Sequence, residues 1–242
     1  MKLKKIASLM LAGVMAVSML AGCSTGSNGG NNGNEGEGEG EGTATGYSAK
    51  LESYLSDEVK DMENVSFQDD AKQATALESA VKNISANEVL KTAKDHAVPD
   101  SIENYTSSDY QAMIAELKKA YDDDDLAEND MNLKWAVDNE NYVNRNKSAS
   151  VVYAVTGSVD LEKSLKSVAN SLDKYFKALP AQGEVNNGAT SGSSGSSDSH
   201  PALVYDYDYT ISVSVVNKPV TVFTEYDGSV NYIAVTVSRT IA

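Results

Sequence analysis

Apolar residues recur at every second position near the C-terminus, and this pattern constrains the fold more than any other feature. Six residues set the pattern: Val213, Val215, Val220, Val222, Ile233 and Val235. A period of two places successive side chains on opposite faces of a β-strand. Asp227-Gly228 is typical of a two-residue hairpin turn, and Asn217-Lys218 is a second candidate turn. The segment is therefore predicted to be a three-stranded antiparallel meander.

The two candidate turns define a register for this meander. They align the apolar residues in two rows, Val213–Val222–Ile233 and Val215–Val220–Val235. Both rows lie on one face of the sheet, and the agreement between separate turns supports the register. Pro219, beside the first turn, is expected to remove one hydrogen bond from the ladder. Three strands do not form a stable domain alone, so the meander needs a cover.

A long amphipathic segment upstream can supply this cover. Between 160 and 179, seven apolar residues lie on one helical face: Leu161, Leu165, Val168, Leu172, Tyr175, Phe176 and Leu179. Pro180 ends this helix, and residues 150–156 are predicted to form a strand that joins the sheet. The Ser/Gly-rich residues 183–200 are predicted to be a flexible insert in this unit. The fold class is therefore α+β, with the meander packed on the long helix.

The region before this unit is predicted to be mainly helical. Apolar periodicity and capping pairs predict helices at about 48–63, from Asp69 or Asp70, from Ser85, from Ser108 and over 126–142. Nothing in the pattern fixes how these helices pack on the sheet. The expected order is therefore N-terminal helices, a strand, the long helix and the meander.

The N-terminus has the features of a secretory signal. Lys2, Lys4 and Lys5 precede an apolar run from Ile6 to Ala21, which ends in small residues. A membrane-spanning helix needs about 20 apolar residues, so this run is short for one. The sequence therefore predicts export rather than a span.

The end of this run, Leu20-Ala21-Gly22-Cys23, resembles the lipobox of bacterial lipoproteins. The resemblance implies cleavage between Gly22 and Cys23 and attachment of a diacylglycerol to the Cys23 sulfur. It implies a protein that is lipid-anchored to the cell membrane through Cys23 and faces outside the cytoplasm. It covers 23 residues and implies no activity.

Cys23 is the single cysteine of the chain. If it is lipidated, disulfides and cysteine catalysis are excluded in the folded part. The residues that follow, up to Gly46, are Ser, Thr, Asn, Gly and Glu with almost no apolar side chain, and they include the acidic repeat 35–42. Such a composition predicts a disordered tether.

The predicted organisation has four parts. They are the signal peptide (1–22), the lipidated cysteine with its tether (23–46), a mainly helical region (47–147) and an α+β region (148–242). Three of the 20 basic residues lie in the signal and all 35 acidic residues follow it, so the mature chain has a formal charge of −18. This charge excludes nucleic acid as a partner, because phosphates require a basic face.

Four tyrosines are the candidate ligand-binding residues. Tyr205, Tyr207 and Tyr209 alternate on one strand, and the predicted register places Tyr226 opposite Tyr209. An aromatic strip of this kind stacks on sugar rings or grips a peptide. The alternative, which we favour, is that these rings cap one end of the core, because aromatic side chains are common in strands.

No catalytic residue, metal site or cofactor is predicted. The acidic run Asp122–Asp125, with Glu128 and Asp130, lacks the glycine and spacing of a calcium loop, so a solvated acidic face is favoured. His96 and His200 have no partner at zinc-binding spacing. We therefore expect a non-catalytic module that binds a cell-wall glycan, a peptide or an envelope protein. An envelope enzyme, such as a wall hydrolase with two carboxylates, is the alternative.

Overall fold

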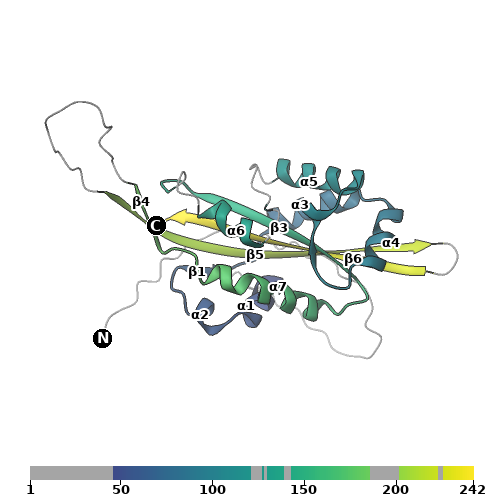
Figure 1. Ribbon diagram of the computed structural model, residues 1–242, viewed down its shortest axis with the longest axis horizontal. Helices are drawn as coiled ribbons and strands as arrows, with labels where there is room; N and C mark the ends of the chain where they lie inside the picture. Colours follow the sequence, from purple (N-terminus) through teal and green to yellow (C-terminus); the bar gives the residue numbers. More distant parts are fainter. Residues whose placement is uncertain (1–45, 121–126, 128–129, 139–142, 186–201, 223–225) are drawn as a thin grey trace, which may run out of the picture. The chain divides into compact units, whose positions relative to one another are not determined.

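A mixed sheet lies at the centre of the computed structural model, which describes residues 46–120, 127, 130–138, 143–185, 202–222 and 226–242 (Figure 1). Its strand order is β1-β5-β6-β3-β2, and β4 pairs with one end of β5. The strands are β1 (Val65–Phe67), β2 (Asp100–Ser101), β3 (Lys147–Thr156), β4 (Gln182–Val185), β5 (Leu203–Val222) and β6 (Tyr226–Ile241). The sheet therefore joins segments from both predicted regions of the folded part.

The C-terminal strands form one long hairpin, so the predicted three-stranded meander is wrong. Asn217-Lys218 lies inside β5 and Asp227-Gly228 lies inside β6. The observed register pairs Val213 with Val235, and the third antiparallel strand beside β6 is β3. The turn preference of these dipeptides is a local effect. Here the continuous pairing of β5 with β6 outweighs it. The strand predicted at 150–156 is confirmed as part of β3.

The predicted rows were also placed on one face, and the structure confirms this for Val213, Val215, Ile233 and Val235 but not for Val220. Val213 belongs to one core cluster and Val220 to the other, because their separation of seven residues along one strand puts them on opposite faces. Pro219 removes no ladder bond. Odd-numbered residues of β5 direct their amides away from β6, as the Tyr209 N–H donates to Asn64 O at 2.7 Å and the Val213 N–H donates to Ser48 Oγ at 2.9 Å.

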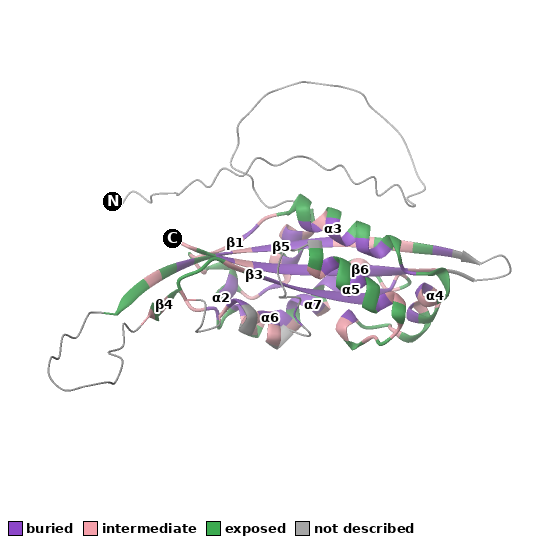
Figure 2. Cartoon of the chain, turned by 90° about the horizontal axis from the view of Figure 1, so that it is seen from above, coloured by how far each residue is buried: buried purple, intermediate pink, exposed green. Residues whose placement is uncertain are grey.

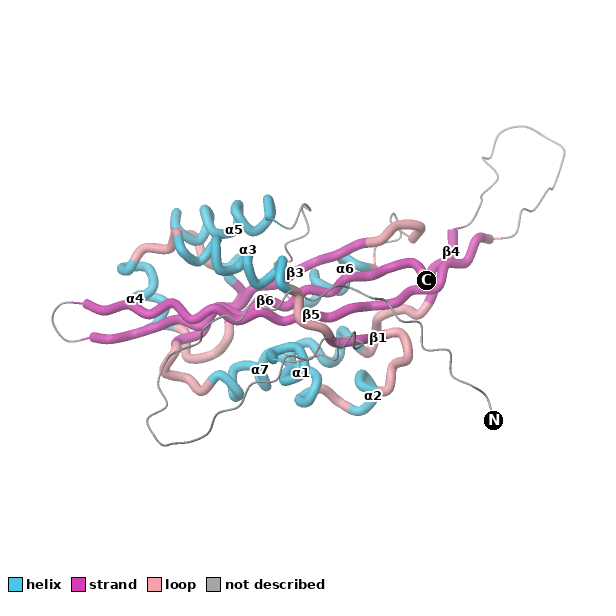
Figure 3. The backbone as a smooth tube through the Cα atoms, turned by 180° about the vertical axis from the view of Figure 1, so that it is seen from behind, coloured by secondary structure: helices cyan, strands magenta, loops and turns pink. Residues whose placement is uncertain are grey.

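Helices cover both faces of the sheet, as Figure 3 shows from behind. On the first face lie α1 (Gly46–Tyr54), α2 (Asp57–Lys60), α6 (Asp130–Val137) and α7 (Leu161–Phe176). On the second face lie α3 (Ala71–Lys82), α4 (Ala86–Asp95), the short η1 (Ile102–Asn104) and α5 (Ser108–Ala120). The buried colour runs along the strands between these layers (Figure 2). The expected α+β class and the packing of the long helix on the sheet are confirmed.

Two of the predicted helix starts, at Asp70 and Ser85, are confirmed by their caps. Asp70 Oδ1 accepts from the backbone N–H groups of Lys72 and Gln73, and Ser85 Oγ accepts from Glu88 N. The helix predicted over 48–63 is instead the two helices α1 and α2, which leave Leu55 and Ser56 between them.

The predicted regions 47–147 and 148–242 belong to one compact unit. The signal, Gly22, Cys23 and the tether up to residue 45 lie outside the described residues, as do residues 186–200 of the predicted insert, whereas Gly46 begins α1. Among the described helices, none is long and apolar enough to span a membrane.

Candidate binding pocket

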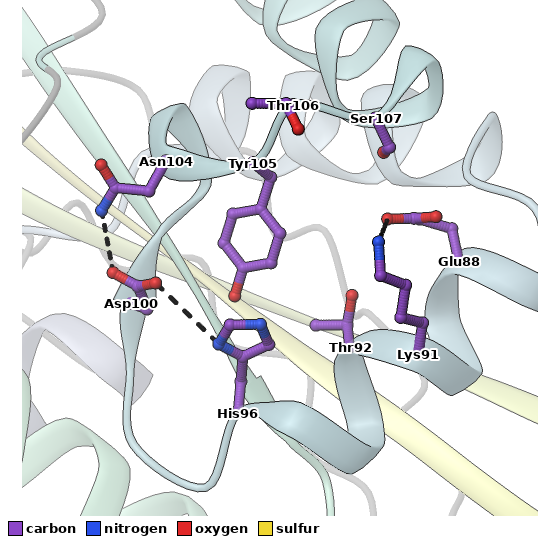
Figure 4. A pocket seen from close by; sticks show the side chains of 9 residues that line it. All are labelled: Glu88, Lys91, Thr92, His96, Asp100, Asn104, Tyr105, Thr106 and Ser107. Carbon is purple, nitrogen blue, oxygen red and sulfur yellow. Dashed lines mark hydrogen bonds and ion pairs between the residues drawn. The ribbon is translucent and has the colours of Figure 1, made fainter.

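A polar pocket of about 170 Å³ opens on the second face of the sheet, between α4, β2 and the segment that joins η1 to α5 (Figure 4). Nine residues line it: Glu88, Lys91, Thr92, His96, Asp100, Asn104, Tyr105, Thr106 and Ser107. Ligand pockets for drug-sized molecules are commonly about 300–1,000 Å³. The pocket therefore fits a small polar molecule or one end group of a longer chain.

The sheet fixes the two titratable groups at the base of the pocket. His96 is the residue after α4, its N–H donates to Thr92 O, and its carbonyl accepts from Thr156 N at 2.8 Å. Asp100 lies in β2 and pairs with Ala154 of β3. Both backbones are therefore held by the end of β3, while their side chains remain partly exposed.

His96 and Asp100 form a loose pair. The distance from His96 Nδ1 to Asp100 Oδ2 is 3.9 Å, which is too long for a hydrogen bond but allows an ion pair when the imidazole is protonated. The other carboxylate oxygen accepts from Asn104 Nδ2 at 2.9 Å. Asp100 is thus oriented by Asn104, and His96 keeps hydrogen-bonding capacity toward the pocket.

Tyr105 lies at the centre of the pocket, with its hydroxyl directed toward His96 (Figure 4). Its ring centroid is 4.7 Å from that of His96 and 4.4 Å from that of Tyr110. The hydroxyl oxygen is buried and has no hydrogen-bond partner among the described residues. Burial, together with the neighbouring Tyr110, raises the pKa of Tyr105, so the group is a neutral hydrogen-bond donor at physiological pH.

A buried hydrogen-bonded chain supports Tyr105 from behind. The Thr92 hydroxyl and the Tyr110 hydroxyl are 2.9 Å apart, and the Tyr110 and Tyr232 hydroxyls are 3.1 Å apart. Thr92, Tyr110 and Tyr232 are all buried. These bonds fix the floor of the pocket, and the hydroxyls that make them are already engaged.

At the rim, Lys91 Nζ lies 3.8 Å from Glu88 Oε1. Glu88, Lys91 and Asp100 together give the pocket a small net negative charge when His96 is neutral. Among the described residues, no group of three or more His, Cys, Asp or Glu could hold a metal ion. The arrangement can donate and accept hydrogen bonds with a neutral or amine-bearing ligand.

Three of the candidate tyrosines from the sequence, Tyr205, Tyr207 and Tyr209, lie elsewhere, at the end of the first face. Tyr207 and Tyr209 are 2% and 1% exposed, and their hydroxyls donate to Val143 O at 2.8 Å and to Pro180 O at 2.9 Å. These two rings therefore cap the core, as in the favoured alternative. Tyr205 is half-buried against the same core.

Tyr226 does not lie opposite Tyr209, so that part of the prediction is wrong. It pairs with Val222, and the partner of Tyr209 is Arg239. The Arg239 guanidinium is 1% exposed, lies 4.3 Å from the Tyr207 ring centroid and donates to Arg145 O. The structure thus brings Tyr207 and Tyr209 together with a buried arginine, away from the pocket.

The remaining candidates fall largely outside the described residues. These are Gly22, Cys23, His200, Glu128 and Asp122–Asp125, whereas Asp130 begins α6. From the sequence, His96 was considered only as a possible zinc ligand, and it has no partner at zinc-binding spacing. The available signal was the spacing of four residues from His96 to Asp100, and again to Asn104, with Tyr105 next to it. That spacing alone does not predict a pocket, because the residues are brought together by the pairing of their segment with β3.

Comparisons with protein-family models, curated proteins and solved structures find no match for this chain.

Proposed function

We propose that this chain is a lipid-anchored lipoprotein, facing outside the cytoplasm, whose folded part is a non-catalytic binding module. The pocket at His96 and Tyr105 takes a polar end group of a cell-wall glycan or peptide. The anchor rests on the lipobox resemblance at Cys23. The binding role rests on the pocket.

The observation that carries the binding role is the Tyr105 hydroxyl, which is buried without a partner at the centre of a polar pocket. A buried hydroxyl without a hydrogen bond costs about 1–3 kcal/mol. A ligand that enters the pocket and displaces the neighbouring His96 ring can accept this hydrogen bond. Ligand binding thereby recovers free energy that the unliganded fold lacks.

The geometry favours binding over nucleophilic catalysis. An activated hydroxyl must lie within about 3.2 Å of its base. The Thr92 hydroxyl is bonded to Tyr110, and Ser107 Oγ accepts from the backbone N–H of Tyr110 at 3.4 Å. Neither hydroxyl is directed to His96 by a hydrogen bond within the described structure. The pocket therefore supplies recognition groups rather than a nucleophile and its base.

The charge of the pocket narrows the ligand class. Glu88 and Asp100 outnumber Lys91, and the mature chain carries a formal charge of −18. Both features disfavour an anionic ligand in the pocket itself. The carboxylates, Asn104 and Tyr105 can hydrogen-bond with hydroxyl, amide and amine groups. Sugars and peptides present such groups.

The test uses the mature chain with Cys23→Ser, which removes the predicted acylation site. The protein is mixed with sacculi freed of anionic polymers, and both the pellet and the released fragments are measured. We expect retention in the pellet without release. The double variant His96→Ala/Asp100→Ala should reduce retention about tenfold or more, because about 1.4 kcal/mol of lost contacts is a factor of ten.

Lys50→Ala/Glu162→Ala is the matched control. It removes an exposed pair with an Nζ–Oε1 distance of 3.3 Å on the other face of the sheet, and it should bind as the parent does. Equal loss in both variants would remove the pocket from the proposal. Release of soluble fragments would instead show a wall hydrolase. No retention at all would point to an envelope protein or a soluble ligand.

A further inference from the structure

The outer face of α7, together with its C-cap residue Lys177, carries a line of basic and neutral residues. Its five members are Lys163, Lys166, Asn170, Lys174 and Lys177, and all five are exposed. At 3.6 residues per turn they fall within an arc of about 80° and extend along about 21 Å. They lie opposite the side of the helix that buries Leu165, Val168 and Leu172. We call this line the lysine face.

The lysine face contrasts with the charge of the whole molecule. It holds four of the 17 basic residues of a mature chain whose formal charge is −18. No carboxylate lies among its five positions, while the carboxylates of Glu162 and Asp173 flank it. The lysine face is therefore a local positive surface on an acidic chain.

The lysines near the start of the helix have no ion-pair partner within the described part of the chain. Neither Lys163 nor Lys166 forms an ion pair with a described residue. Lys174 Nζ lies 4.5 Å from the centre of the Tyr175 ring, which leaves its charge available. Lys177 is already held by Glu58 at 2.6 Å and Asp173 at 2.9 Å.

Lys163 also occupies a position where the helix dipole is unfavourable for a positive charge. It lies in the first turn of α7, where the unpaired N–H groups make the potential positive and favour acidic side chains. Glu162 and the capping Asp160 follow this preference, whereas Lys163 does not. Helix stability therefore does not explain the position of this lysine.

We propose that the lysine face docks one strand of a linear, phosphate-rich polyanion, and that Lys163, Lys166 and Lys174 make the contacts. Three point charges along a straight helix match a polymer that repeats its charge along a line. Such a partner is an anionic polymer of the cell surface. The proposal is independent of the pocket, which lies on the other face of the sheet.

A linear polymer fits better than an anionic lipid surface. An interfacial helix needs exposed large apolar side chains beside its lysines. In the described residues the exposed large apolar side chains are Val98, Leu203 and Val204, and none of them is on α7. A flat anionic membrane would also meet the net negative charge of the whole domain, whereas a single strand meets only the line of lysines.

The test measures binding of long-chain inorganic polyphosphate to the mature Cys23→Ser chain by fluorescence anisotropy over a series of salt concentrations. We expect binding at low ionic strength that weakens steeply with salt. Lys163→Gln/Lys166→Gln should reduce affinity on the order of tenfold. It should also reduce the slope of log K against log salt by about 1.4, because each contact with a single strand contributes about 0.7.

Lys72→Gln/Lys119→Gln is the matched control, since it removes the same charge from exposed positions on α3 and α5. It should keep the slope of the parent. Equal loss in both double variants would overturn the proposal, as would no binding at low salt. Binding to vesicles of anionic lipid that depends on Lys163 and Lys166, without binding to polyphosphate, would also overturn it in favour of a membrane surface. Retention on polymer-free sacculi reports the pocket alone, so the two proposals fail separately.

Discussion

The two faces of the central sheet are built from the same strands but buried in different ways. The first face is mostly apolar, with Val151, Val213 and Val235 in one core cluster with residues of α7, and the buried Arg239 lies at one end of it. The second face mixes small apolar residues with Ser150, Ser212, Ser214 and Thr236, all of them buried. A strand in which apolar and polar residues alternate therefore need not have its polar side exposed to solvent. A helix that supplies hydrogen-bonding groups can cover that side.

Gln73 of α3 makes this cover possible. Its side chain donates to Thr236 Oγ1 at 2.7 Å and accepts from Ser214 Oγ at 3.1 Å, and Thr236 is 2.6 Å from Ser150 Oγ. A buried polar group is tolerated when it is hydrogen-bonded. The candidate pocket lies on this same face, beside the Thr92–Tyr110–Tyr232 chain. The first face thus contributes mainly apolar burial, while the second contains both buried hydrogen-bonded groups and the candidate pocket.

The largest expected effects test whether both faces are true cores. Leu172→Ala on the first face and Leu117→Ala on the second should each reduce the free energy of unfolding by about 2–5 kcal/mol, because both side chains are 0% exposed. Urea unfolding measures both changes. A loss below about 1 kcal/mol for Leu117→Ala alone would mean that the second face is only loosely covered.

An intermediate effect tests the polar network. Gln73→Leu should reduce stability by about 1–3 kcal/mol, because Ser214 loses its partner in a buried site. Adding Ser214→Ala should restore part of this loss, since the group without a partner is then removed. Thermal unfolding of the two variants gives the comparison. If the second change makes the protein less stable still, the hydroxyl of Ser214 has another role.

The smallest expected effect distinguishes the hydroxyl in the pocket, on Tyr105, from the hydrogen-bonded hydroxyl behind it, on Tyr110. Tyr105→Phe removes a hydroxyl that has no partner, so stability should stay constant or rise by up to about 1 kcal/mol, while retention on sacculi falls. Tyr110→Phe is the control, because this hydroxyl is bonded to both Thr92 and Tyr232, and its loss should lower stability by about 1–3 kcal/mol. Unfolding and retention assays on both proteins measure the two effects. A clear loss of stability in Tyr105→Phe would mean that its hydroxyl is satisfied in solution.

Much of the fold could be predicted from local patterns. The helix over 161–176 was visible because its apolar residues repeat at helical spacing, and the starts at Asp70 and Ser85 were visible because capping depends on neighbouring residues. The hairpin was placed wrongly for the same reason. Asp227-Gly228 has the composition of a turn, but pairing along the whole of β5 and β6 decides where the chain reverses.

The pocket could not be predicted, because its residues acquire their geometry from contacts with β3 and Tyr232 that are far away in the sequence. The lysine face could have been found, because it needs only the period of a helix already recognised. Its significance, however, depends on knowing that, among the described residues, Lys163 and Lys166 form no ion pair while Lys177 forms two.

The sequence by itself determined the α+β class and the long helix, because these follow from composition and from residues close together in the chain. The proposed anchor at Cys23 rests on the sequence alone. The tertiary structure alone decided that both faces of the sheet are buried, that Tyr207 and Tyr209 belong to the core, and that His96, Asp100 and Tyr105 line a pocket. The reason is physical. A β-strand presents two faces with equal ease, and only the elements that pack on each face determine which side chains are left for binding.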